Sequence, residues 1–166
     1  MAEITLKGNP IHTAGELLPI GSEAPDFVLT NSALEDVGLA AFEGKKKILN
    51  ITPSLDTSLC AMSAARFNKE VAERGDTVLL NVSADLPFAA GRVCELNKLE
   101  HVVTLSTFRS PSFGKDYAVE IIDGPMSGLM SRAVIILDEQ NKVIYTEQVP
   151  EIGQEPNYEA AIAALG

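Results

Sequence analysis

The chain has 166 residues, 46% of them hydrophobic, and this length and content suit one compact domain. Lys and Arg total 13 and Asp and Glu total 23, so the formal net charge is -10. This charge argues against nucleic acids and anionic membranes as partners, because both are bound by clusters of Lys and Arg. No apolar run reaches the roughly 18 residues that span a bilayer, and the N-terminus does not resemble a signal peptide. The sequence therefore predicts a cytoplasmic protein.

In chain order, the hydrophobic pattern predicts strands and helices that alternate in the middle of the chain. Gly8, Asn9 and Pro10 are expected to form the turn of an N-terminal hairpin, and a second hairpin is expected near the end. The expected strands are Glu3–Lys7, Ile11–Thr13, Phe27–Thr30, Lys47–Ile51, Thr77–Ser83, Val102–Leu105, Ser131–Asp138 and Val143–Gln148. The expected helices run from Cys60 towards Gly75, from a cap at Asp85 to about Leu99, from Ser112 to Tyr117 and from Tyr158 to Leu165. This order is typical of an α/β sandwich.

Cys60 is expected in the first turn of the first long helix, immediately after a buried strand. The helix is predicted because Cys60, Ala64, Phe67 and Val71 recur at the spacing of one helical face. A thiolate is the reactive form of cysteine, and the free N–H groups at a helix start stabilise an anion there. Asp56, Thr57 or Ser58 can cap this helix, and the sequence leaves the choice open.

The chain has two cysteines, Cys60 and Cys94. In the reducing cytoplasm a pair of cysteines favours catalysis or redox sensing over a permanent disulfide, although both can also serve as small buried apolar side chains. The basic run Lys45–Lys47 precedes a hydrophobic strand and is interpreted as a solvated strand entrance.

The residues around Cys60 resemble a known family. The pattern Pro53-x-x-x-Thr57-x-x-Cys60 is similar to the active-site motif of the peroxiredoxins. The Ser-Leu-Asp-Thr segment before Cys60 resembles their thiol peroxidase subfamily, and Ala61, where many peroxiredoxins have a proline, favours the same branch. Further resemblances follow in one order along nearly the whole chain, at Gly21–Phe27, Arg66–Asn68, Leu105–Arg109, Val149–Ile152 and Glu155–Tyr158.

The resemblance implies a thioredoxin-like sandwich, with a central mixed β-sheet flanked by helices. A single domain would cover residues 1–166, with residues 1–14 as an N-terminal hairpin extension. Cys60 would be the peroxidatic nucleophile, and Thr57 would donate a hydrogen bond to the peroxide. Arg132 would stabilise the thiolate and the charge on the leaving oxygen, for which a permanent cation with fixed donors is suited. Pro53 would shield the sulfur from water.

The resemblance also implies that Cys94 resolves the sulfenic acid on Cys60 as an intramolecular disulfide. Hydrogen peroxide and alkyl or lipid hydroperoxides are the expected substrates, in antioxidant defence, with thioredoxin as reductant and a homodimer as assembly. No cofactor and no metal are expected. Five apolar residues can line a substrate pocket but are more simply interpreted as core: Leu59, Met62, Leu86, Phe88 and Met130.

Other classes of protein are possible on the residues alone. A thioredoxin-like disulfide oxidoreductase normally needs a Cys-x-x-Cys pair, but position 57 is Thr. A cysteine hydrolase would need His12 or His101 as its base, and neither has a recognisable local signature. The two Cys and two His lack the close spacing of zinc ligands. A non-catalytic redox-sensing or binding module is the main alternative from a different class.

Overall fold

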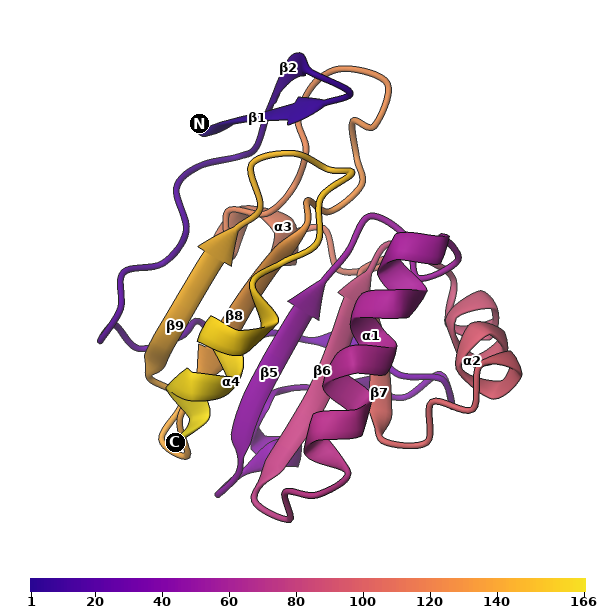
Figure 1. Ribbon diagram of the computed structural model, residues 1–166, viewed down its shortest axis with the longest axis vertical. Coiled ribbons are helices and arrows are strands. Elements are labelled where there is room, and N and C mark those ends of the chain that lie inside the picture. The colour runs from indigo at the N-terminus through magenta and orange to yellow at the C-terminus, as the bar shows by residue number, and fades with distance from the viewer.

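A computed structural model describes all residues from 1 to 166 (Figure 1). Its strands are β1 (Glu3–Leu6), β2 (Asn9–His12), β3 (Leu29–Thr30), β4 (Asp36–Val37), β5 (Lys46–Ile51), β6 (Thr77–Ser83), β7 (Val102–Ser106), β8 (Ala133–Leu137) and β9 (Val143–Gln148). Its helices are α1 (Ser58–Val71), α2 (Pro87–Leu96), α3 (Phe113–Asp116) and α4 (Tyr158–Leu165), with a short 3-10 helix at Leu39–Phe42.

Seven strands form one mixed sheet in the order β4-β3-β7-β6-β5-β8-β9. β5, β6 and β7 run parallel, whereas β8 pairs antiparallel with β5 and β9 antiparallel with β8. β1 and β2 form a separate two-stranded hairpin at one end of the molecule (Figure 1). The expected α/β architecture with a central mixed sheet and an N-terminal hairpin is confirmed.

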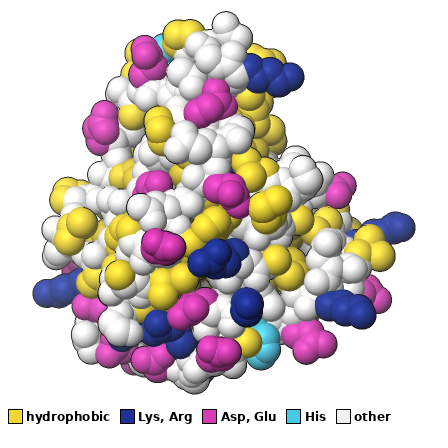
Figure 2. Space-filling view, viewed as in Figure 1, with side chains coloured by type: hydrophobic (Ala, Val, Ile, Leu, Met, Phe, Trp, Pro, Cys, Tyr) yellow, Lys and Arg dark blue, Asp and Glu magenta, His cyan; other side chains and the backbone are white.

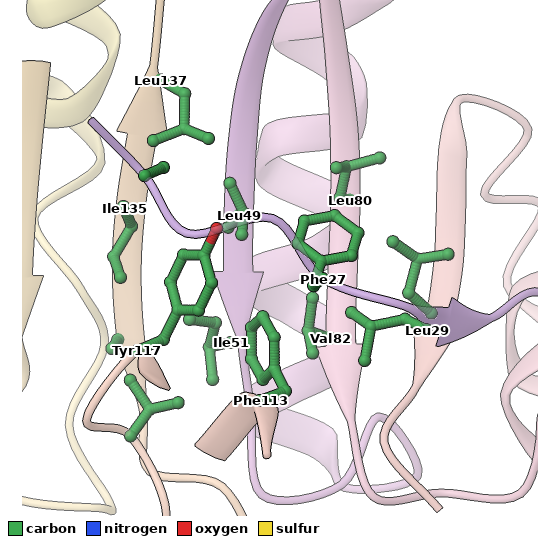
Figure 3. Close-up of a cluster of buried hydrophobic side chains, with 14 of the residues drawn as sticks. Phe27, Leu29, Leu49, Ile51, Leu80, Val82, Phe113, Tyr117, Ile135 and Leu137 are labelled. Carbon is green, nitrogen blue, oxygen red and sulfur yellow. The ribbon is translucent and has the colours of Figure 1, made fainter. Parts of the chain in front are cut away.

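The side chains of β5 alternate between the two faces of the sheet, as the pleat of a strand requires. Ile48 packs on the face covered by α1 and α4, where Phe67 contacts Tyr158 edge to face. Leu49 and Ile51 pack on the opposite face, in the largest core cluster. Figure 3 shows that Phe27, Phe113 and Tyr117 lie over the strands in that cluster. Because both faces of the sheet are covered, nearly every residue of β5 and β6 is buried, polar ones such as Asn50 and Asn81 included.

Several expected elements have different ends in the structure. Asn9 and Pro10 lie in β2, and the hairpin turns instead at Lys7 and Gly8, which both have positive φ angles. The predicted strand at 27–30 retains only its last two residues, and the short strand β4 was not predicted. α1 ends at Val71 rather than at Gly75, and α2 ends at Leu96 rather than near Leu99.

The prediction that Asp85 caps α2 is wrong. The residue at the helix start is Leu86, and no side chain caps this helix. The carboxylate of Asp85 is used elsewhere, because it accepts hydrogen bonds from Ser54, Leu55 and Ser83. Pro87 at the first position of the helix removes one of the four N–H groups that have no partner within the helix.

The interpretation of Lys45–Lys47 as a solvated run is wrong for Lys47. This side chain is fully buried, and its Nζ donates to Asn141 Oδ1 at 2.5 Å. Lys47 lies within β5, in a sheet with both faces covered, so its side chain points into the protein.

On the face seen in Figure 2, Lys and Arg side chains are dispersed among Asp and Glu and form no continuous basic patch. None of the helices combines the length and the apolar character that a membrane crossing requires.

Candidate active site

The register of β5 and β8 brings Arg132 to the loop that leads to Cys60. Ile51, the last residue of β5, pairs with Ala133, the first residue of β8. Arg132 precedes Ala133, and the chain after Ile51 continues through Pro53 into α1. The two segments therefore meet where β5 ends and β8 begins. Two residues that are 72 positions apart in the sequence thereby come into contact.

Thr57 caps α1, which settles the choice between Asp56, Thr57 and Ser58. Its backbone is extended, and its Oγ1 accepts a hydrogen bond from the N–H of Cys60 at 3.3 Å. The same hydroxyl donates to the carbonyl oxygen of Ser54 at 3.2 Å. Cys60 is therefore the third residue of the helix, in its first turn, where the helix dipole favours a negative charge.

Arg132 is a buried cation that contacts the Cys60 sulfur. Its Nη1 donates to Cys60 Sγ at 3.3 Å, and its Nε donates to the carbonyl oxygen of Ile152 at 2.7 Å. Arg132 is 4% exposed and Cys60 is fully buried. None of the ion pairs in the structure includes Arg132. Because a buried charge is costly without a partner, this geometry stabilises a negative charge on the sulfur.

A cavity of about 250 Å³ opens onto Cys60. Arg132, Pro53 and Thr57 contribute to its wall together with Cys60. Ser58 and Leu59 of α1 also line it, and three other segments complete the wall with Leu6, Lys7, Met126, Glu151, Ile152 and Gly153. The cavity therefore places four of the five predicted site residues around one small space that leads to the sulfur.

Cys94 lies apart from this cavity, in the last turn of α2. It is partly buried against a small cluster that includes Leu55, Ala64 and Val93, and burial raises the pKa of its thiol. Both cysteines are free thiols. Ala64 lies one turn after Cys60 on α1, so Cys94 packs beside the helix that carries Cys60 without sharing its cavity.

The apolar residues that could line a pocket divide between three environments. Leu59 lines the Cys60 cavity, and Met130 is buried in the main core. The interpretation of Met62, Leu86 and Phe88 as core residues is wrong, because they are 53%, 56% and 69% exposed.

Two acidic residues that the sequence pattern does not assign to the site organise it. Asp85 binds the loop before α1 through Ser54 Oγ and the Leu55 N–H, each at 2.7 Å. Glu151 binds the turn of the N-terminal hairpin and lines the cavity. Their positions beside motif segments were visible in the sequence, but no local pattern indicates which distant backbone groups they contact.

The residues required by the alternative chemistries lie elsewhere. His12 pairs with Asp123 through Nδ1 at 2.7 Å, and His101 lines a different cavity. Neither histidine lines the cavity at Cys60, which disfavours a cysteine hydrolase. The structure contains no cluster of three or more His, Cys, Asp or Glu that could hold a metal ion.

The chain is similar to known proteins over nearly its whole length. The model of the Redoxin family matches residues 19–162. Thiol peroxidases of Mycobacterium tuberculosis and Mycobacterium bovis are 53% identical over 166 residues, which is 100% of this chain and 99% of each relative. The crystal structure of a peroxiredoxin-like protein from Aquifex aeolicus is 35% identical, with a TM-score of 0.91 over 98% of this chain and 95% of that one.

A thiol peroxidase from Chromobacterium violaceum also has a TM-score of 0.91, at 23% identity over 98% of this chain and 94% of that one, which compares the fold alone. The expected thioredoxin-like fold is confirmed by these structural matches. These two structural matches each cover 98% of the chain. The Redoxin family model begins at residue 19, after the N-terminal hairpin of β1 and β2.

Proposed function

The chain belongs to the redoxin family as a thiol peroxidase of the peroxiredoxin type, and on this premise we propose that Cys60 attacks hydroperoxides and Cys94 resolves the product. The observation that carries the proposal is the contact of the buried Arg132 guanidinium with Cys60 Sγ at the wall of an apolar cavity. A cation without a carboxylate partner, directed at a cysteine in the first turn of a helix, supports a nucleophilic role for that sulfur.

In the first step the Cys60 thiolate attacks one oxygen of the peroxide and the O–O bond breaks. The sulfur becomes a sulfenic acid, and the other oxygen leaves as hydroxide or alkoxide and takes up a proton to give water or an alcohol. Arg132 stabilises the thiolate before the attack and the developing charge on the leaving oxygen afterwards. The Thr57 hydroxyl, which lines the cavity, donates to the peroxide in place of the Ser54 carbonyl.

In the second step the Cys94 thiol condenses with the sulfenic acid, which forms a disulfide and releases water. A disulfide tolerates Cα atoms no more than about 7 Å apart. Because the two cysteines belong to different helices and face different surroundings, we propose that the first turn of α1 and the end of α2 unwind during this step. Amide exchange around residues 57–63 and 89–97 should then be faster in the oxidised protein, and equal exchange in both forms would contradict unwinding.

Mass spectrometry of the fully reduced protein tests both cysteine roles. One equivalent of an organic hydroperoxide should produce a peptide in which Cys60 and Cys94 are crosslinked. A Cys94→Ser variant should stop at the sulfenic acid on Cys60. A protein that stays reduced, or that is oxidised only at Cys94, would rule out the mechanism and favour a non-catalytic module.

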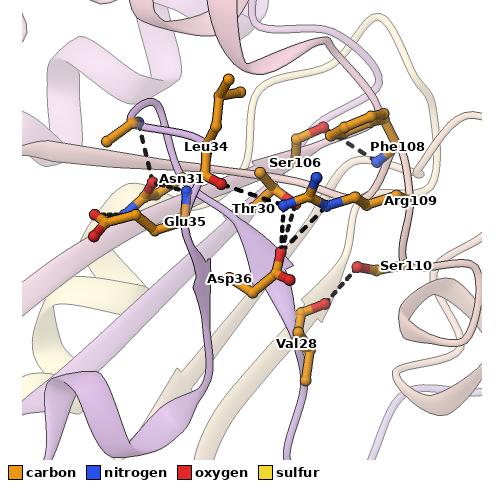
Figure 4. A network of polar contacts seen from close by, with 11 residues as sticks. Val28, Thr30, Asn31, Leu34, Glu35, Asp36, Ser106, Phe108, Arg109 and Ser110 are labelled. Carbon is orange, nitrogen blue, oxygen red and sulfur yellow. Dashed lines mark hydrogen bonds and ion pairs between the residues drawn. The ribbon is translucent and has the colours of Figure 1, made fainter.

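The physiological context is part of the proposal. Hydrogen peroxide and alkyl or lipid hydroperoxides are the proposed substrates, and the mainly apolar cavity supports the organic ones. Thioredoxin is the proposed reductant of the disulfide, in antioxidant defence in the cytoplasm. The proposed assembly is a homodimer, and an exposed face around the Asp36–Arg109 ion pair, with Val28, Leu34 and Phe108 beside it, is a suitable surface (Figure 4).

A further inference from the structure

The N-terminal hairpin is joined to the loop that follows β9. The Thr5 N–H donates to the carbonyl oxygen of Pro150 at 2.8 Å, and the Ile152 N–H donates to the carbonyl oxygen of Thr5 at 2.9 Å. Thr5 and Glu151 thereby form a parallel bridge between two segments from opposite ends of the chain. The position of this loop depends on the hairpin.

Both carboxylate oxygens of Glu151 accept hydrogen bonds that strengthen the junction between the hairpin and the loop. Oε1 accepts from Thr5 Oγ1 at 3.0 Å and from the Gly8 N–H at 2.9 Å. Oε2 accepts from the Gly153 N–H at 2.7 Å. The hydrogen bonds from Gly153 and Gly8 hold the pKa of Glu151 below its usual value, so the group is ionised at neutral pH. One charged side chain therefore fixes the hairpin turn and the loop on either side of Ile152.

Ile152 connects the loop after β9 to Arg132 in the candidate active site. Its carbonyl oxygen accepts from Arg132 Nε at 2.7 Å, and the same guanidinium donates from Nη1 to Cys60 Sγ at 3.3 Å. Ile152 and Arg132 are both buried, at 6% and 4% exposure. A planar guanidinium that is held at Nε has a fixed direction for its remaining donors. The direction in which Nη1 points thus depends on where the Ile152 carbonyl lies.

We propose that Glu151 is a positioning residue for Arg132, acting through the Ile152 carbonyl, and that the N-terminal hairpin is the support against which it acts. The inference rests on the proposed attack of Cys60 on peroxide. None of the hydrogen bonds of Glu151 reaches Cys60 or Arg132, so its effect on the sulfur is indirect. Displacement of a charged group by a fraction of an ångström is enough to slow a reaction about tenfold.

The test substitutes Glu151→Gln, which preserves the size of the side chain but can accept hydrogen bonds on only one of its two sides. The rate of Cys60 oxidation by an organic hydroperoxide is measured for the wild type, Glu151→Gln, Arg132→Gln and the double variant. We expect Glu151→Gln to slow the oxidation of Cys60 about tenfold when Arg132 is present. It should slow oxidation less than about twofold when Arg132 is already replaced, because coupled residues are not additive.

A second readout separates positioning from a general loss of stability. The pH profile of Cys60 alkylation by iodoacetamide should move to higher pH in Glu151→Gln, because a displaced guanidinium stabilises the thiolate less. Asp138→Asn is the matched control, since the Asp138 carboxylate also accepts two main-chain N–H groups but lies at the turn between β8 and β9, at the other end of β5. It should leave both the rate and the profile unchanged.

Should Glu151→Gln not fold, Thr5→Val removes the Thr5 hydroxyl from the carboxylate and should give the same effects on a smaller scale. Equal slowing with and without Arg132, or no slowing at all in a folded variant, would overturn the positioning role. A wild-type protein whose Cys60 does not react with peroxide would instead overturn the proposed function itself.

Discussion

Thr57 has two roles that a substitution can separate. Its hydroxyl caps α1 and also lines the cavity at Cys60. Thr57→Val, which keeps the shape without the hydroxyl, should lower the free energy of unfolding by about 1 kcal/mol through loss of the cap. Oxidation of Cys60 should slow by about 100-fold, because a donor to the reacting oxygens is lost. Stopped-flow oxidation and thermal unfolding measure the two effects, and Thr57→Ser should restore both. If the activation free energy of Cys60 oxidation rises only by as much as the free energy of unfolding falls, Thr57 is chiefly a helix cap.

Lys47 is the residue at which the sequence interpretation failed most clearly, and its burial has a measurable cost. Burial lowers the pKa of Lys47 below its usual value of 10.5, although Asp138, Glu139 and Glu43 partly oppose the shift. The unfolded chain then binds more protons than the folded one just below pH 10.5, so this group makes stability rise with pH in that window. At lower pH Lys47 is charged in both the folded and the unfolded state. Burial of this charge then lowers the free energy of unfolding by an amount that does not change with pH.

Lys47→Met should therefore raise the melting temperature at pH 7, by about 2–4 °C for each 1 kcal/mol gained in a chain of this size. The advantage over the wild type should shrink as the pH rises towards 10.5. Thermal unfolding between pH 7 and pH 10.5 measures this difference, with Lys45→Met as the control, because Lys45 is exposed. A variant that is less stable than the wild type at pH 7 would show that the Lys47–Asn141 hydrogen bond outweighs the cost of burial.

At the scale of elements, Asp85 joins the two segments that carry the cysteines. Its carboxylate binds the loop before α1, while the chain at Asp85 itself continues into α2. Asp85→Asn should lower the free energy of unfolding by about 2 kcal/mol, because charge-assisted hydrogen bonds are lost. Amide exchange should quicken at residues 54–60. Asp26→Asn is the matched control, since Asp26 accepts the N–H groups of Phe27 and Leu39 away from the cysteines. Unchanged exchange at residues 54–60 would show that Asp85 does not hold this loop.

At the scale of the whole molecule, the exposed face in Figure 4 bears on the proposed homodimer. Val28, Leu34 and Phe108 are 60%, 45% and 45% exposed, and Val28 lines a cavity of about 430 Å³ together with Asp36 and Arg109. Apolar side chains around a charged pair are typical of a surface that a partner covers. We expect light scattering to give the mass of a dimer for the wild type.

Val28→Asp combined with Phe108→Asp should give the mass of a monomer, because each change buries a carboxylate at the proposed interface. Ile20→Asp is the control for an added surface charge, since Ile20 is 66% exposed and lies outside this cavity. A wild-type monomer would contradict the homodimer, and a dimer that survives both changes would place its interface on another face.

The sequence by itself determined the elements whose signals are local. The spacing of apolar residues from Cys60 to Val71 predicts a helix, and the structure confirms it with Cys60 in the first turn. The motif from Pro53 to Cys60 similarly identified the family. Such local patterns predict the structure correctly because helical periodicity and the capping of a helix start depend only on neighbours within a few residues.

Only the tertiary structure decided how distant segments meet. The contact of Arg132 with Cys60 depends on the register of β5 and β8, and the junction at Glu151 depends on a hairpin at the other end of the chain. The burial of Lys47 and the exposure of Phe88 follow from which faces of the sheet and of α2 are covered. Such contacts are set by packing over long sequence separations, for which a single sequence carries no periodic signal.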